Sequence, residues 1–407
     1  MTASRKLRLL QLAPRFAAHP TSGAELRNYH LAERLSRQMF VTQIGFITPG
    51  HTPDASPGGA APRFIPVPRH GSYRPLDLVR GVMGSVPFSV LNYTRREMTG
   101  ALQRLLSEER FDIVQLESIH LAGYLPVIRA AANPPRAIVC DWHNIESEVL
   151  QRYGDTTPSL PRRAYARHAA RKLREYERSF VQACNLHIAV SERDRETLRQ
   201  FGAREPIAVI ENGVDIRQFS FSEAGDAPPK RYRVVFVGAM DYHANIDGAA
   251  FFAREVWPQV AASLPDATFT IVGRNPSGEV SALARGERIE VTGTVPDVRP
   301  YYQEALVAVA PLRVGGGTRL KILEAMAAGV PVVSTTLGAE GLAAQADADY
   351  LLADTGTAMA QAILDLARDP VRCARVAAAG RELVQRRYDW AALGDELAAR
   401  LFEIVRP

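Results

Sequence analysis

The chain has 407 residues, of which 46% are hydrophobic and 23% are charged, and its formal net charge is +5. This length exceeds what one hydrophobic core usually holds, and the composition is ordinary for globular proteins, so we expect two domains. No stretch approaches the roughly 18 apolar residues that cross a bilayer, which argues against an integral membrane protein. The three cysteines are isolated and lack metal-ligand spacing, which favours a reducing, cytoplasmic setting.

Charge is distributed unevenly along the chain. Residues 1–212 carry 29 Lys and Arg against 20 Asp and Glu, a net charge of +9, whereas residues 213–407 have a net charge of −4. We therefore expect the first half to attract an anionic surface or acceptor. The segment 161–180 is especially basic and predicts one long helix, which either is solvated with local ion pairs or contacts a membrane.

The first half alternates apolar runs with helical patterns. The opening basic and apolar segment is interrupted by Arg8 and Gln11, so it predicts a buried strand and not a signal peptide. Helices are expected at 24–37 and 192–200, and strands at 7–13, 41–47, 113–116, 137–140, 186–190 and 207–210. Such alternation is typical of a parallel sheet covered on both faces. We assign residues 1–212 to an N-terminal Rossmann-like domain.

The second half repeats this alternation. Its expected strands are 234–237, 268–272, 289–291, 307–310 and 330–334. Residues 211–232 carry glycine, proline and charge without an apolar period, so we place the hinge there. The second domain is expected at 213–387, with a C-terminal helix of about 388–407 packing back on the first domain.

Residues 78–93, LVRGVMGSVPFSVLNY, are mostly apolar but show no clear helical or strand period, and Arg95 and Arg96 follow them. Exposed apolar groups beside arginines suit contact with anionic lipid or with a lipid-linked acceptor. The alternative is that these residues fill the core under a long connection. The sequence leaves both open.

His143 lies in DWHNIES, directly after the apolar run 137–140. Open α/β sheets bind ligands at the carboxyl ends of their strands, so this histidine is a candidate site residue. A single histidine is more often structural. The nearby Glu146 and Glu148 either cap a helix or help to position an acceptor.

Residues 307–335, VAVAPLRVGGGTRLKILEAMAAGVPVVST, are the most informative segment of the chain. They predict a strand, a turn at Gly315, Gly316 and Gly317, a helix capped by Thr318 and ending near Ala328, and a second short strand. The start of that helix directs free N–H groups and a partial positive charge at whatever lies above the turn.

Charged residues follow this turn. Arg319 and Lys321 add two positive charges in the first turn of the helix, where the helix dipole disfavours them unless an anion such as phosphate is bound. Glu324 lies further along, and a carboxylate there can accept two hydrogen bonds from the diol of a ribose. This pattern predicts a site for a nucleoside diphosphate. The alternative is an ordinary loop followed by a solvated glutamate.

The same segment resembles the donor-site signature of the family-four retaining glycosyltransferases with the GT-B fold, in which a glycine-rich loop, a helix and the pattern LEAMA-x-G-x-PVV occur in this order. Residues 186–216, with AVSERDRETLRQFG followed by VIENGVD, resemble another block of that family. The resemblance spans most of the chain and becomes weak between about residues 50 and 110.

The resemblance implies two Rossmann-like doubly wound domains that face each other across a cleft. It implies a donor site that includes Gly23, Gly238 and Thr294 with the residues 315–318, and it places His143 toward the donor sugar and the acceptor. It also implies that neither a metal nor a cofactor is needed, and the sequence has no DxD-like carboxylate pair in a donor loop.

The chain departs from the family pattern at two places. Gly316 stands where members often have the first of two glutamates, and Ala239 stands where many have an arginine. We therefore expect Arg319 and Lys321 to neutralise the pyrophosphate, with Arg274 as a weaker third cation.

These observations predict a hexosyltransferase that uses a nucleotide sugar with retention of configuration. Its expected acceptor is a glycan or a lipid-linked glycan of an envelope or exopolysaccharide pathway, and not a nucleic acid. We expect a cytoplasmic protein that contacts the inner face of an anionic membrane peripherally. The alternatives are a sugar-nucleotide epimerase and a non-catalytic nucleotide-binding module. The sequence does not identify the nucleotide, the sugar, the linkage or the oligomeric state.

Overall fold

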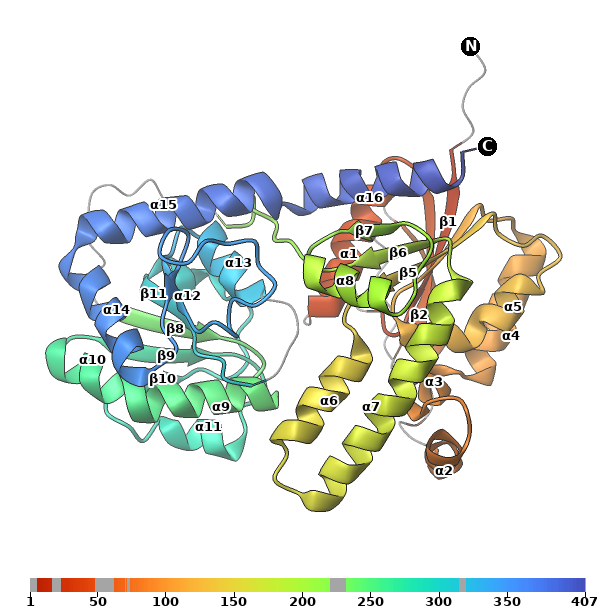
Figure 1. Cartoon of the computed structure of the whole chain (residues 1–407). Helices are drawn as coiled ribbons and strands as arrows, with labels where there is room; N and C mark the ends of the chain where they lie inside the picture. Colours follow the sequence, from red (N-terminus) through yellow and green to blue (C-terminus); the bar gives the residue numbers. More distant parts are fainter. Residues whose placement is uncertain are drawn as a thin grey trace, which may run out of the picture. The chain divides into compact units, whose positions relative to one another are not determined.

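The computed structural model describes residues 6–16, 23–47, 62–69, 71, 74–219, 232–314 and 320–406. The chain divides into two compact units, Met1–Glu211 with Trp390–Pro407, and Asn212–Asp389. Each unit contains one parallel sheet with helices packed on it (Figure 1). No helix within the described ranges is both long and apolar enough to span a membrane.

The first unit contains a seven-stranded sheet with the order β3-β2-β1-β4-β5-β6-β7. Its strands are β1 (Arg8–Ala13), β2 (Phe40–Ile47), β3 (Arg63–Pro68), β4 (Ile113–Leu116), β5 (Ala137–Trp142), β6 (Leu186–Ala189) and β7 (Ile207–Val209). The chain extends the sheet in one direction through β3 and then in the other from β4. The strand order therefore reverses between β1 and β4, and such a switch point is where doubly wound sheets bind ligands.

Helices cover both faces of this sheet. They are α1 (Gly23–Ser36), α2 (Pro75–Met83), α3 (Phe88–Tyr93), α4 (Arg96–Glu108), α5 (Leu125–Arg129), α6 (Glu146–Thr156), α7 (Leu160–Phe180), α8 (Glu192–Gln200) and α16 (Trp390–Ile404), with 3₁₀ turns η1 (Ile119–Tyr124) and η2 (Val181–Ala183). The long helices α6 and α7 lie side by side (Figure 1).

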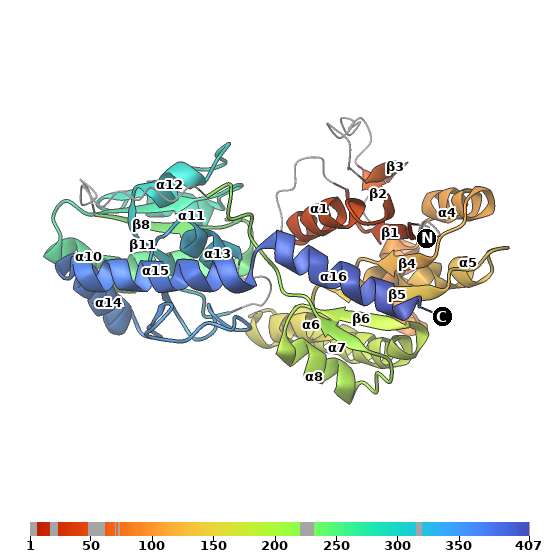
Figure 2. The same ribbon diagram turned by 90° about the horizontal axis from the view of Figure 1, so that it is seen from above.

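The C-terminal helix α16 lies along α1 (Figure 2). Arg34 of α1 donates from Nε to Asp395 of α16 at 2.8 Å, and Gln38 donates to the same carboxylate at 2.7 Å. The His30 ring stacks on Trp390 with 5.5 Å between the ring centroids. These contacts explain why the last helix belongs to the first unit although the second unit precedes it in the chain.

The second unit contains a six-stranded sheet with the order β10-β9-β8-β11-β12-β13. Its strands are β8 (Arg233–Val237), β9 (Thr268–Val272), β10 (Ile289–Val291), β11 (Ala305–Ala310), β12 (Val332–Ser334) and β13 (Leu351–Leu352). The switch point lies between β8 and β11. Its helices are α9 (His243–Phe251), α10 (Trp257–Ser263), α11 (Gly278–Leu283), α12 (Arg299–Gln303), α13 (Leu320–Ala327), α14 (Gly356–Arg368) and α15 (Pro370–Arg387), with the π-helical turn η3 (Phe252–Val256) between α9 and α10.

Alternation along the strands builds a core on each face of the second sheet. Val234 and Phe236 of β8 face one buried cluster together with Phe269, whereas Val235 faces the other together with Leu323 and Met326 of α13. Because α13 is held by this second cluster, the start of the helix is anchored beside the carboxyl ends of β8 and β11.

Candidate functional site

In the first unit, His143 lies in a cluster of buried charged residues at the carboxyl ends of β4 and β5. Leu116 pairs with Cys140 in the register of these parallel strands, so Glu117 and Asp141 follow as neighbours. Alternation then places His143, two residues after Asp141, on the same side of the sheet. Glu117, Asp141 and His143 are 1%, 0% and 8% exposed. The carboxyl ends of β4 and β5, next to the switch point, therefore hold a carboxylate pair and an imidazole.

Glu117 is bound directly to the histidine. The distance between His143 Nε2 and Glu117 Oε2 is 3.1 Å, and Gln115 donates from Nε2 to Glu117 Oε1 at 2.6 Å. Burial raises the pKa of the Glu117 carboxyl, and the hydrogen bond from His143 opposes this shift.

Asp141 is neutralised by Arg27 of α1. The guanidinium donates to both carboxylate oxygens, from Nε at 2.9 Å and from Nη2 at 3.1 Å, and Nη1 donates to the backbone oxygen of Glu211 at 3.0 Å. Both side chains are almost fully buried, at 1% and 0% exposure. A bidentate pair of this kind holds α1 at a fixed height above the strand ends.

Glu117, Asp141 and His143 also offer ligand atoms that lie within 4.8 Å of one another, which is close enough to surround a metal ion. However, both oxygens of Asp141 already accept from Arg27, and a cation would have to compete with that guanidinium. The donor set therefore fits a metal poorly. The absence of a metal requirement stays a prediction.

In the second unit, Lys321 lies in the first turn of α13 and contacts Asn245 in the first turn of α9. Its Nζ donates to Asn245 Oδ1 at 2.6 Å and lies 4.6 Å from the centre of the Phe236 ring. Asn245 in turn donates to the backbone oxygen of Ala239 at 2.8 Å. Gly238 leaves room for this contact, since a Cβ there would approach Asn245 Nδ2 to 2.7 Å. The β8 loop and the start of α13 are thus joined at the switch point.

Glu324, one turn after Lys321, is partly buried beside Tyr302 of α12. The Tyr302 hydroxyl contacts Glu324 Oε2 at 3.3 Å and the Lys321 backbone oxygen at 3.2 Å. Burial raises the pKa of Glu324 to about 7, while the tyrosine hydrogen bond and the charge of Lys321 oppose the shift. Burial and the neighbouring carboxylate raise the pKa of Tyr302. The carboxyl group is therefore positioned but weakly solvated.

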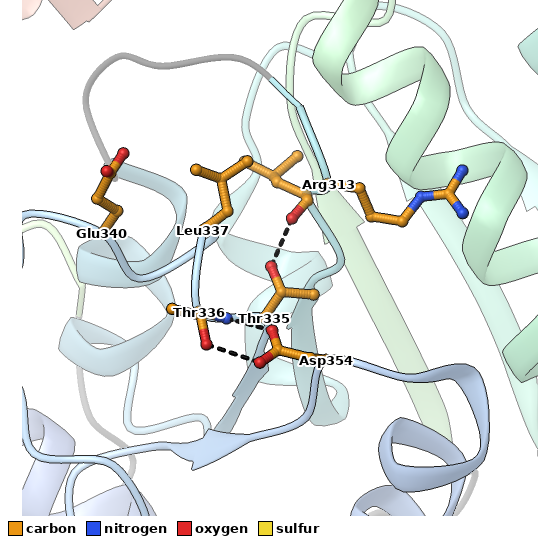
Figure 3. A pocket seen from close by; sticks show the side chains of 7 residues that line it. Arg313, Thr335, Thr336, Leu337, Glu340 and Asp354 are labelled. Carbon is orange, nitrogen blue, oxygen red and sulfur yellow. Dashed lines mark hydrogen bonds between the residues drawn. The ribbon is translucent and has the colours of Figure 1, made fainter.

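A pocket of about 340 Å³ lies at the carboxyl ends of β11, β12 and β13 (Figure 3). Hydrogen bonds order its rim: Thr335 donates to the Leu312 backbone oxygen at 2.5 Å, and Thr336 donates from its backbone N and its hydroxyl to Asp354, both at 2.7 Å. Its lining consists of Leu312, Arg313, Thr335, Thr336, Leu337, Glu340 and Asp354. In Figure 3 the Arg313 side chain points away from Thr335, and it pairs with Asp247 of α9 at 2.8 Å.

Some of the predicted donor-site residues lie outside the described structure, and others lie within it. Gly315, Gly316, Gly317, Thr318 and Arg319 lie outside the described residues. Gly23 is the first residue of α1. Thr294 is exposed after Gly293, which has a φ of +72°.

Three further residues that the sequence singles out lie in segments that follow strands. Arg274 follows β9 and accepts through its backbone oxygen from Met240 at 2.9 Å. Glu146 and Glu148 lie in the first turn of α6, and Glu148 pairs with Arg193 at 2.8 Å.

The partners of the predicted residues were not predicted from the sequence. Glu117 follows an apolar run just as His143 does, so the strand-end argument could have found it. Asp141 directly precedes the predicted histidine. For Arg27, Asn245 and Tyr302 the sequence carries no local signal, because each acts through a contact with a distant element.

Comparison with known families decides the class of the protein. The model described as Glycosyltransferase Family 4 matches residues 21–218, and the model described as Glycosyl transferases group 1 matches residues 231–369. Together they cover well over half of the chain. The chain is a family-four glycosyltransferase. This confirms the family and the enzyme class that the sequence predicts.

This glycosyltransferase is similar to curated mannosyltransferases. It is 27% identical over 354 residues to a phosphatidyl-myo-inositol mannosyltransferase of Mycobacterium leprae, covering 85% of this chain and 83% of the relative. It is 27% identical over 219 residues to the lipopolysaccharide core biosynthesis mannosyltransferase LpcC of Rhizobium leguminosarum bv. viciae, covering 50% of this chain and 60% of the relative.

Solved structures share the fold of this glycosyltransferase. Sucrose-phosphate synthase from Thermosynechococcus elongatus aligns with a TM-score of 0.74 at 18% identity, covering 98% of this chain and 100% of that one. Anabaena HepE, in complex with UDP and glucose, aligns with a TM-score of 0.65 at 16% identity, covering 98% and 100%. These alignments confirm the predicted GT-B class, with one parallel-sheet α/β fold in each unit.

Proposed function

We propose that this glycosyltransferase transfers a hexose from a nucleoside-diphosphate sugar to a lipid-linked acceptor of the cell envelope, with retention of configuration. The observation that carries the proposal is the pairing of Lys321 with Asn245 beside Glu324 at the second switch point. It provides a fixed cation and a carboxylate one helical turn apart at the edge where doubly wound sheets bind nucleotides.

The two side chains suit the two halves of a nucleoside diphosphate. Lys321 has three N–H donors, and one of them holds Asn245 while the ammonium keeps its charge for a phosphate. Glu324 has two carboxylate oxygens, which can accept hydrogen bonds from both hydroxyls of a ribose. The predicted phosphate contacts of residues 315–318 and of Arg319 belong to the same proposal.

The chemistry follows from the charge that develops on the leaving group. As the bond between the anomeric carbon and the diphosphate oxygen breaks, Lys321 and backbone N–H groups stabilise the diphosphate. The acceptor hydroxyl attacks on the face that the phosphate leaves, its oxygen bonds to the anomeric carbon, and its proton passes to the departing phosphate. His143 is assigned a contact with the transferred sugar. No step needs a metal.

Mannose from GDP-mannose is the donor we favour. The relatives from Mycobacterium leprae and Rhizobium leguminosarum are named as mannosyltransferases, and a Corynebacterium glutamicum relative, 28% identical over 235 residues, is named as GDP-mannose-dependent. The names of these relatives also refer to phosphatidylinositol and lipopolysaccharide, which supports a lipid-linked acceptor.

The surface of α2 supports a membrane-bound acceptor. The apolar segment 78–93 divides in the structure: Val90 of α3 is fully buried, whereas Val79 and Met83 of α2 are 59% and 82% exposed. Leu76, two residues before the segment, is 62% exposed. Hence α3 fills the core, and α2 does not. We define the α2 face as Leu76, Leu78, Val79, Val82 and Met83, which are all exposed.

The α2 face lies next to positive charge. The Lys172 ammonium of the basic helix α7 donates to the Gly81 backbone oxygen, and His168 Nε2 lies 3.4 Å from the Val82 backbone oxygen. Exposed apolar side chains beside a basic helix favour peripheral binding to an anionic leaflet. We therefore place the enzyme at the cytoplasmic face of the inner membrane.

A donor panel tests the proposal. Purified protein is incubated with radiolabelled GDP-mannose, UDP-glucose, ADP-glucose or TDP-glucose and a bacterial lipid extract, and label in the lipid phase is counted. We expect transfer from GDP-mannose and an α-linked product by NMR. Conversion of the free nucleotide sugar without an acceptor would favour the epimerase, and binding without any turnover would favour the non-catalytic module.

A further inference from the structure

The Glu117 carboxylate is surrounded by hydrogen-bond donors. Gln115 donates from Nε2 to one of its oxygens at 2.6 Å. In the amide orientation that satisfies both of its side-chain polar atoms, Asn28 of α1 donates from Nδ2 to the other oxygen at 2.8 Å, and this nitrogen lies 3.2 Å from both the Ala24 backbone oxygen and His143 Nε2. The imidazole of His143 is the third group, with Nε2 at 3.1 Å.

The two amide nitrogens limit where protons can lie in this cluster. An amide nitrogen donates and cannot accept, so neither Gln115 nor Asn28 could receive a proton from Glu117. Asp141 does not compete for the histidine, because both of its oxygens accept from Arg27. When Glu117 is ionised and accepts from all three neighbours, the two amide hydrogens of Asn28 go to Glu117 and to the Ala24 oxygen. None is left for His143 Nε2, so the histidine proton must be on Nε2.

We propose that Glu117 is a positioning residue that holds His143 with its proton on Nε2, so that Nδ1 presents a lone pair to a hydroxyl group of the substrate. Among the described residues, none forms a hydrogen bond with His143 Nδ1, and 8% of the His143 surface is exposed to solvent. This inference rests on the proposed function for the identity of the hydroxyl, which belongs to the sugar or to its acceptor. The tautomer itself does not depend on any ligand.

The substitution Glu117→Gln reverses the polarity of this contact. Glutamine has nearly the same shape, so its oxygen can still accept from Gln115. Its nitrogen takes the place of Oε2 and donates to His143 Nε2, and to Asn28 once that amide turns its oxygen toward it. The neutral imidazole must then carry its proton on Nδ1, and Nδ1 changes from acceptor to donor. A carboxylate that served packing alone would leave the tautomer unchanged.

Nitrogen NMR of ring-labelled histidine tests this on the ligand-free protein at about pH 8.5, where an ordinary imidazole is neutral. The variant His143→Gln identifies the His143 signals by their loss. We expect the wild type to show a protonated Nε2 and an unprotonated Nδ1, and Glu117→Gln to show the reverse. Glu177→Gln is the matched control, because Glu177 is also fully buried in the first unit but accepts from the Ser147 backbone. It should leave the His143 signals unchanged.

A wild-type ring protonated on Nδ1 would overturn the inference, and this holds even if Glu117→Gln does not fold. An unchanged tautomer in a folded Glu117→Gln protein would also overturn it. With any donor that is turned over, kcat/KM should fall about threefold to tenfold in Glu117→Gln, the value of one neutral hydrogen bond, and stay unchanged in Glu177→Gln. Failure of every donor would contradict the proposed function and leave the NMR result as the separate test of Glu117.

Discussion

Asn245 and Lys321 lie 76 positions apart in the sequence, and their side chains meet at 2.6 Å. The contact joins the first turn of α13 to the first turn of α9, and Asn245 donates in turn to the backbone oxygen of Ala239, in the loop after β8, at 2.8 Å. Ala239 itself carries no charge, and an asparagine orients a lysine from the neighbouring strand connection. The positive charge thus comes from α13, which follows β11, and not from the loop that follows β8.

Binding to Glu324 should depend on pH. Its carboxyl has a pKa of about 7 because it is buried, and the ionised form is the one that accepts two hydrogen bonds from a ribose. Below pH 7 the free protein must therefore lose a proton to bind, so affinity for GDP should increase as the pH is raised from 6 to 7 and level off above. Calorimetry of wild type and Glu324→Gln across this range isolates the effect, since titration of the phosphate is common to both.

At pH 8, Glu324→Ala should weaken nucleotide binding by about 1.5 to 3 kcal/mol, the range for hydrogen bonds to a charged group. Glu287→Gln, at a side chain with 82% exposure, is the control and should change nothing. Equal affinity of a folded Glu324→Ala protein and the wild type would remove the ribose role.

Breaking the Arg27–Asp141 pair should destabilise the first unit. Removing one partner leaves the other charge buried, and such changes cost about 3 to 5 kcal/mol. We expect this loss in urea unfolding of Arg27→Met and of Asp141→Asn, with much of it recovered in the double variant Arg27→Met/Asp141→Leu. The exposed helical pair of Arg37 with Glu33 is the control, and Arg37→Met should cost below about 0.5 kcal/mol. A loss under about 1 kcal/mol at Arg27 would contradict the buried bidentate geometry.

The α2 face should bind anionic membranes. In sedimentation with vesicles, the wild type should bind phosphatidylglycerol vesicles at low salt, bind them less at high salt, and bind neutral vesicles weakly. Replacing Val79 and Met83 by serine should reduce binding by about tenfold or more, since the two side chains bury apolar surface in the bilayer. Val371→Ser is the matched control, because Val371 is 80% exposed on the second unit. Absence of salt-sensitive binding would leave a soluble acceptor as the better interpretation.

The sequence predicts the bounds of several elements closely. The helices starting at Gly23 and Glu192 and the strand at Thr268–Val272 appear within a residue of the expected bounds. The strand β3 was missed because Pro66 and Pro68 are poor strand formers, which an edge position tolerates. The strand β13 has two residues, too few for a pattern.

The site was predicted less completely, for a physical reason. His143, Lys321 and Glu324 occur in motifs and at element ends, where local sequence indicates a ligand site. Their partners Glu117 and Asn245 depend on strand register and on helix packing, which bring distant segments together and leave no periodic signal.

Calorimetry of one variant shows whether Lys321 binds a phosphate of the donor nucleotide. Lys321→Met keeps the apolar stem over Phe236 and removes the charge. We predict that GDP affinity falls by about tenfold to a hundredfold while guanosine affinity is unchanged, because only the diphosphate carries the charge that the ammonium meets. Arg254→Met, which removes an exposed cation of the same unit, should alter neither. Equal losses of affinity for GDP and guanosine, or an unchanged affinity for GDP, would show that Lys321 does not bind the phosphate.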